Sequence, residues 1–84
     1  MNSTHYNLSK DNGQHKKVKE EYNKEVTKLL SGFPEVFQAF EKAWQSEQYR
    51  HAHLVVHDAT MQLDLKYSPQ QDKTFSNFYW LFVA

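Results

Sequence analysis

The sequence predicts an α+β fold, with two antiparallel helices followed by a small antiparallel sheet of two or three strands and both helices on one face of the sheet. Three patterns lead to this prediction. Apolar residues recur at helical spacing over residues 18–45, alternate with polar residues over 59–67, and form an almost unbroken run over 75–83. The first pattern is typical of amphipathic helices, and the other two are typical of strands.

The first helix is expected to begin near residue 18. Its apolar residues recur every three or four positions and would form one stripe along the helix. They are Val18, Tyr22, Val26, Leu29 and Leu30. We expect Gly32 to end this helix, because glycine readily adopts the left-handed conformation of a helix C-terminus.

A second helix is expected to begin at Pro34, because a proline in the first turn of a helix removes no hydrogen bond. Phe37, Phe40 and Trp44 would then lie on one face of it. The link over residues 31–33 is short, so the two helices must be neighbours in space. We expect their apolar stripes to face the same core.

The remaining segments predict strands and a loop. Residues 59–67 alternate with a period of two, which indicates a strand with one solvated face. Residues 68–73 read as a loop, and residues 75–83 would pair with the first strand as a hairpin. Residues 50–58 fit either a further strand or an extension of the second helix, and their β-branched side chains favour the strand.

The chain has 84 residues, enough for one domain. Residues 1–17 are mostly polar, with Tyr6 and Leu8 the large apolar side chains beyond the initial methionine. We expect them to form a mobile arm, with a short strand over 6–9 as the alternative. Residues 18–84 would then form a single α+β domain.

Charge and composition exclude several classes of function. Ten basic and ten acidic residues give a net charge of zero, which makes nucleic acid and anionic membranes unlikely partners. The absence of cysteine excludes disulfides and thiolate metal sites and suits a reducing compartment. No apolar stretch is long enough for a signal peptide or a membrane span, so we expect a cytoplasmic protein.

No motif indicates catalysis or a cofactor. With only two glycines, the chain lacks the phosphate-binding and dinucleotide-binding loops, and it has no nucleophile elbow. We therefore expect a protein that is not an enzyme and binds no cofactor.

The histidines His51, His53 and His57 are weak candidates for metal binding. A strand would bring the first two together and a helix the last two, but neither arrangement supplies a third ligand from nearby sequence. We expect no metal site. Repulsion between protonated histidines is a further hypothesis, which would make them a pH sensor.

The terminal strand carries the functional prediction. Both of its faces are apolar, two helices can cover only one, and a second copy or a partner protein would cover the other. We therefore expect a protein-interaction module, such as a regulator, inhibitor or adaptor, that forms a homodimer. Small neutral proteins of this kind often come from phages or mobile elements, an analogy of size alone. The expected interaction residues are Trp80, Tyr79, Phe82, Phe78 and Trp44.

A single-stranded nucleic-acid binding protein is the alternative hypothesis. Lys16, Lys17 and Lys19 form a basic patch that could contact phosphates, while the aromatic strand could stack on bases. Two glutamates follow the patch directly and dilute its charge. The identity of a protein partner does not follow from the sequence.

Overall fold

The protein is helical throughout the described part of the chain. The computed structural model describes the backbone of residues 2–84 and the side chains of residues 13–84. Within these residues there are four α-helices, one π-helical turn and no strand, so the prediction of an α+β fold is wrong. The elements are α1 (Asn2–Leu29), α2 (Pro34–Gln45), α3 (Tyr49–Leu63), α4 (Pro69–Phe78) and the π-helical turn η1 (Tyr79–Val83).

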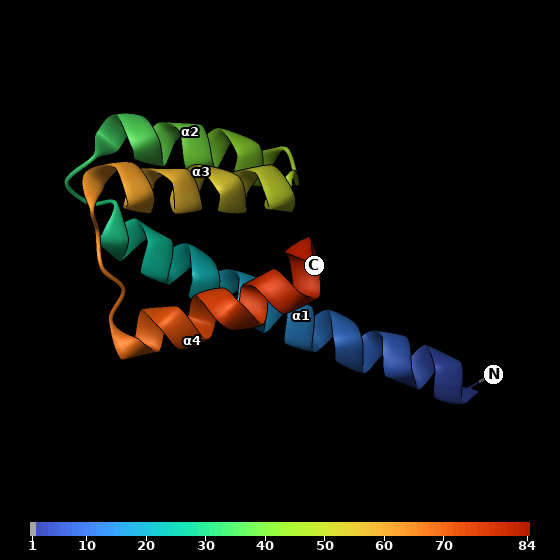
Figure 1. Ribbon diagram of the computed structural model, residues 1–84. Helices are drawn as coiled ribbons and strands as arrows, with labels where there is room; N and C mark the ends of the chain where they lie inside the picture. Colours follow the sequence, from blue (N-terminus) through green and yellow to red (C-terminus); the bar gives the residue numbers. More distant parts are fainter. Residues whose placement is uncertain (1) are drawn as a thin grey trace.

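The helices form two layers of two (Figure 1). Helices α2 and α3 lie side by side and antiparallel, because only three residues, 46–48, separate them. Helices α1 and α4 contact each other beneath this pair. The turn η1 then brings the end of the described chain back against α3.

The core receives side chains from all four α-helices. The first predicted stripe is confirmed, since Tyr22 and Val26 of α1 and Leu30 directly after it are buried. The helix predicted from Pro34 is also confirmed, with Phe40 buried. The rest of the core comes from Ala43, Ala52, Val56, Phe75 and Phe78.

The end of α1 differs from the prediction at Gly32. No described glycine has a positive φ, so Gly32 does not adopt the left-handed conformation. The chain instead turns through short-range hydrogen bonds, in which Ser31 N donates to Lys28 O and Phe33 N to Leu30 O. Such tightened turns satisfy the last carbonyls of a helix without a left-handed residue.

The strand predicted over residues 59–67 is wrong, and so is the strand favoured over 50–58. Both segments belong mainly to α3, whose buried face is formed by Ala52, Val56, Ala59 and Thr60. The alternating pattern arose because Met61 and Leu63 are apolar but exposed. The β-branched residues gave a weak signal, because strand propensity depends on what a side chain packs against.

The loop predicted over 68–73 is wrong beyond Ser68, because these residues begin α4. Ser68 accepts a hydrogen bond from Gln71 N at 3.1 Å, and the Gln71 side chain accepts one from Ser68 N at 3.0 Å. This reciprocal pair is a capping box, and Pro69 occupies the first helical position. The sequence therefore carried a helix-start signal that the loop interpretation overlooked.

The terminal strand predicted over residues 75–83 is also wrong. Phe75, Phe78 and Phe82 are three and four positions apart, and the first two are buried in the core while Phe82 packs against it. Alternation along this aromatic run concealed the helical spacing of these three side chains.

The N-terminal segment belongs to α1, which begins at Asn2. The strand considered for residues 6–9 is therefore not formed. The side chains of residues 1–12 lie outside the described part of the chain, so the division into an arm and a domain stays a prediction.

Candidate functional site

An aromatic cluster centred on Tyr22 holds the two layers together. The Tyr22 ring stacks on Phe78, with ring centroids 3.7 Å apart and an interplanar angle of 11°. It also stacks on Trp44 at 5.6 Å and meets Phe75 edge-on at 5.1 Å. Because these rings come from α1, α2 and α4, this cluster fixes how the helices sit against one another.

The structure divides the five predicted interaction residues into two groups. Phe78 is fully buried, and Trp44 and Phe82 pack against the core, so these three side chains stabilise the fold. Tyr79 and Trp80 are exposed. These two are therefore the most exposed of the five, whereas Trp44 and Phe82 are only partly exposed.

The π-helical turn η1 explains why consecutive apolar side chains face solvent. Ala84 N donates to Tyr79 O at 2.8 Å, which is the wide hydrogen-bonding pattern of a π-helix. Phe82 and Val83 pack back on the core, while Tyr79, Trp80 and Leu81 remain outside, with Trp80 70% exposed. We name these three residues the aromatic turn. Single π-helical turns occur frequently at functional sites.

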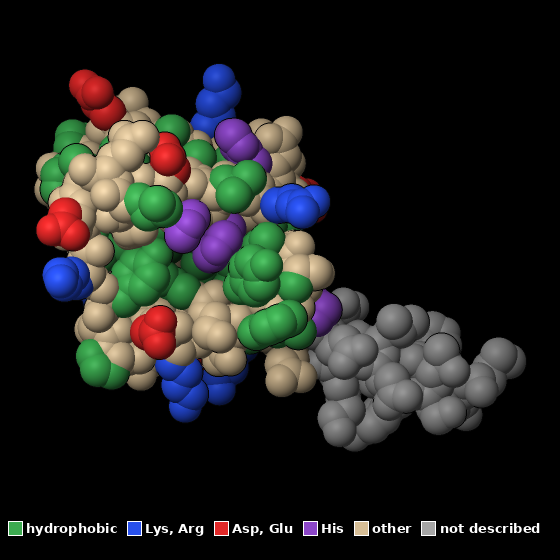
Figure 2. All heavy atoms as spheres, in the orientation of Figure 1, with side chains coloured by type: hydrophobic (Ala, Val, Ile, Leu, Met, Phe, Trp, Pro, Cys, Tyr) green, Lys and Arg blue, Asp and Glu red, His purple; other side chains and the backbone are tan. Residues whose placement is uncertain are grey.

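The structure also divides the three candidate histidines into two groups. His53 and His57 lie one helical turn apart on α3, with parallel rings 6.4 Å apart, whereas His51 is exposed beside Lys42 and Gln48. Figure 2 shows histidine side chains gathered in the seam between α3 and α4, beside hydrophobic groups. Asp72, Tyr67 and Tyr79 also line this cleft.

The cleft does not form a metal centre. Among residues 13–84, no three histidine or carboxylate side chains are close enough together to hold a metal ion. His53 and His57 alone would provide two ligands, fewer than the three protein ligands of a catalytic zinc site.

His53 instead contacts the centre of the core. Its Nδ1 atom is 3.2 Å from the hydroxyl of Tyr22. Donation by the hydroxyl is favoured, because it leaves no buried O–H group without a partner. Burial raises the pKa of Tyr22 far above its usual range, and the nearby Tyr67 adds to this effect. Burial, followed by the proximity of His57, lowers the pKa of His53. The Tyr22 hydroxyl and the His53 imidazole are therefore both held neutral near pH 7.

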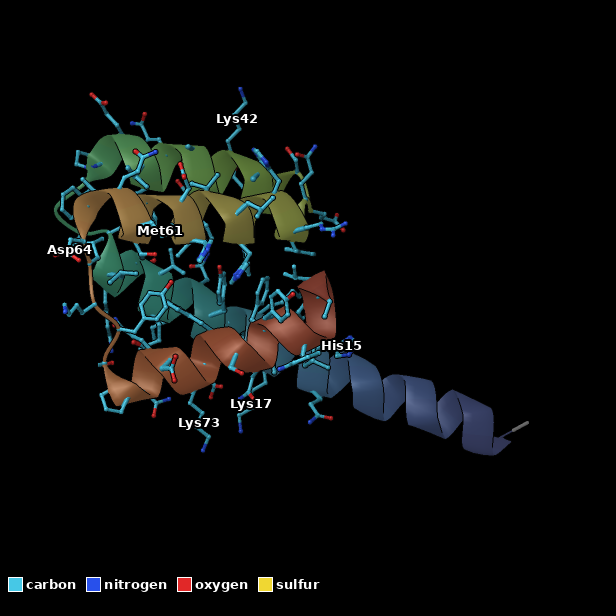
Figure 3. All side chains as sticks on the ribbon, in the orientation of Figure 1. His15, Lys17, Lys42, Met61, Asp64 and Lys73 are labelled. Carbon is cyan, nitrogen blue, oxygen red and sulfur yellow. The ribbon has the colours of Figure 1, made fainter. Side chains whose placement is uncertain are left out.

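The predicted basic patch is divided between two sides of α1. Lys16 and Lys19 line an open groove together with Trp44 and Tyr49, whereas Lys17 points away from the α2–α3 layer (Figure 3). The aromatic strand proposed as its stacking surface does not exist. The sequence did not predict Tyr49 as part of this groove. Tyr49 is the first residue of α3, a helix that the sequence did not predict as a separate element.

Comparison with known proteins gives no indication of identity. No family model matches the chain, and no curated protein or solved structure is detectably similar to it. None of the described helices is both long and apolar enough to cross a membrane. The function must therefore be argued from the geometry of the described residues.

Proposed function

We propose that this chain is a non-enzymatic protein-interaction module of the cytoplasm, and that it self-associates through the aromatic turn. The observation that carries the proposal is the exposure of Trp80, at 70%, between the partly exposed Tyr79 and Leu81. Tryptophan and tyrosine are enriched among the residues that dominate binding energy at protein interfaces. The lack of a recognised catalytic motif and of cysteine supports the non-enzymatic and cytoplasmic parts of the proposal.

A second copy of the chain is the occupant that fits this surface best. Residues 77–84 contain no charged side chain, and the centres of protein interfaces are depleted in charge. The net charge of zero means that two copies do not repel each other at long range. A two-fold axis through the aromatic turn would place each Trp80 against the partner's apolar surface.

The oligomeric state in solution tests this proposal. Light scattering coupled to size exclusion, over a range of concentrations, should give a mass approaching twice the 10.0 kDa of one chain. Trp80→Glu should restore the mass of one chain, because it would bury a carboxylate in the apolar contact. The helical content of this variant should match that of the unaltered protein.

Met61→Glu is the matched control. Met61 is exposed to almost the same extent, at 69%, and lies on α3, where Figure 3 shows it away from the C-terminal turn. This variant should still dimerise. A wild-type chain that stays monomeric at high concentration would refute self-association, as would a Trp80→Glu variant that still dimerises.

A further inference from the structure

A groove between α1 and the α2–α3 connection combines positive charge with aromatic side chains. One face of α1 supplies Lys16, Lys19, Glu20, Asn23 and Lys24, which recur at helical spacing. The end of α2 supplies Trp44 and the start of α3 supplies Tyr49. We name this hollow the lysine groove. It encloses about 480 Å³ and shares no lining residue with the aromatic turn.

The charge of the lysine groove is not neutralised from within. Three lysines face one glutamate, which leaves two net positive charges. Among the side chains of residues 13–84, the sole ion pair is Lys28 with Glu25, so no lysine of the groove has a carboxylate within 4.0 Å there. An anion entering the groove would therefore meet ammonium groups that have no carboxylate partner among the described side chains.

Lys19 is already held in position at the groove. Its Nζ atom is 3.3 Å from the Tyr49 hydroxyl, 5.0 Å from the centre of the Tyr49 ring and 5.9 Å from that of Phe82. These contacts keep a partly buried cation in place by its attraction to aromatic rings. A positioned ammonium group loses less side-chain entropy on binding an anion than a freely rotating one.

The aromatic lining distinguishes the groove from a simple basic patch. Trp44 and Tyr49 meet edge to face, with ring centroids 5.0 Å apart. Both side chains are half-buried, so they are rigid and still partly open to the groove. Nucleobases stack on aromatic side chains of this kind without regard to sequence. The volume also falls within the range of about 300–1,000 Å³ that is usual for small-molecule sites.

We propose that the lysine groove binds a phosphate ester attached to an aromatic base, the chemistry of a nucleotide. The lysines would contact the phosphate and the aromatic pair would contact the base. A free mononucleotide and a nucleotide within a single strand present this same chemistry, and the groove is open enough for either. The proposal does not depend on self-association, because the aromatic turn lies outside the groove.

Fluorescence of Trp44 provides the test. A Trp80→Phe variant leaves Trp44 as the only tryptophan. It would be titrated with adenosine monophosphate, a short thymidine single strand, adenosine and inorganic phosphate. Either of the first two should change Trp44 emission in a saturable manner, and comparing them identifies the source of the ligand. Adenosine and phosphate should each bind at least tenfold more weakly, since each lacks half of the recognised group.

Neutralised lysines provide the matched comparison. Lys16→Gln and Lys24→Gln should each weaken binding by about tenfold, the loss expected for a hydrogen bond to a charged group. Lys17→Gln removes the same charge outside the groove and should leave affinity within about twofold of the parent, since a distant surface charge is screened by salt. The absence of saturable binding by both nucleotide probes would overturn the proposal. Equal losses in all three variants would also overturn it, because they would indicate non-specific attraction to charge.

Discussion

Replacing Phe78 with alanine should destabilise this protein more than replacing the larger Trp80. Phe78 is fully buried and its ring contacts come from all four other elements. Tyr22, Trp44 and Phe82 stack on it at 3.7, 5.6 and 4.9 Å, and rings of α3 also contact it. Trp80 is 70% exposed, so its removal takes little apolar surface out of the core. The sequence had predicted both side chains as interaction residues, without separating the buried one from the exposed one.

The expected magnitudes differ widely. Truncation of a buried phenylalanine to alanine costs about 3–5 kcal/mol, which combines lost burial with the cavity left behind. A domain of 84 residues has a total stability of roughly 4–13 kcal/mol, so the Phe78→Ala variant would lose a large part of it. The melting temperature should fall by at least about 15 °C. Trp80→Ala should change the stability of the single chain by less than about 1 kcal/mol.

Thermal and urea unfolding followed by far-UV circular dichroism would measure both effects. Phe78→Leu fills most of the space and should cost less than about 1.5 kcal/mol, which keeps the comparison possible if Phe78→Ala does not fold. Measurements at low protein concentration limit any contribution from self-association. If Trp80→Ala lowered the stability of the single chain as much as Phe78→Ala, the described division between core and surface aromatics would be wrong.

Two further predictions concern the hydrogen bonds of the fold. The pKa of His53 is lowered in the folded state, so the unfolded chain binds the extra proton more readily. Stability should therefore be complete above about pH 6.5 and decrease as the pH falls below it. Protonation would also give Nδ1 a hydrogen and leave the buried Tyr22 hydroxyl without its acceptor. Melting temperatures measured from about pH 8 to about pH 5 should show this decrease. The decrease should weaken in His53→Gln and persist in His51→Gln, and an unchanged profile in His53→Gln would contradict the prediction. Separately, Ser68→Ala removes the acceptor of the α4 capping box and should cost about 1 kcal/mol in urea unfolding, while an unaffected midpoint would show that Pro69 alone starts the helix.

The candidate sites could be predicted in part. The sequence predicted Tyr79 and Trp80 as contact residues by their aromatic character, and the structure leaves both exposed. It could not tell that Phe78 and Phe82 face the core while Tyr79 and Trp80 face solvent. An alternating strand and a helix that ends in a π-helical turn orient the side chains of residues 78–83 differently. It also identified Lys16 and Lys19, but their aromatic neighbours in the groove come from α2 and α3, which only the folded chain places beside α1.

The sequence by itself determined α1 from residue 18 onward and α2, because their apolar residues recur at helical spacing beside polar ones and Pro34 marks a helix start. Only the tertiary structure decided the states of residues 49–63 and 75–83, whereas the capping box of Ser68 and Gln71 marks the start of α4 in the sequence. The α3 face that is buried there includes two alanines and a threonine, which contribute little to a hydrophobic pattern. Exposed leucine and methionine residues imitated a strand instead. The free energy that selects the helices comes from packing those small residues and three phenylalanines around Tyr22, and that gain exists only when all four helices are assembled.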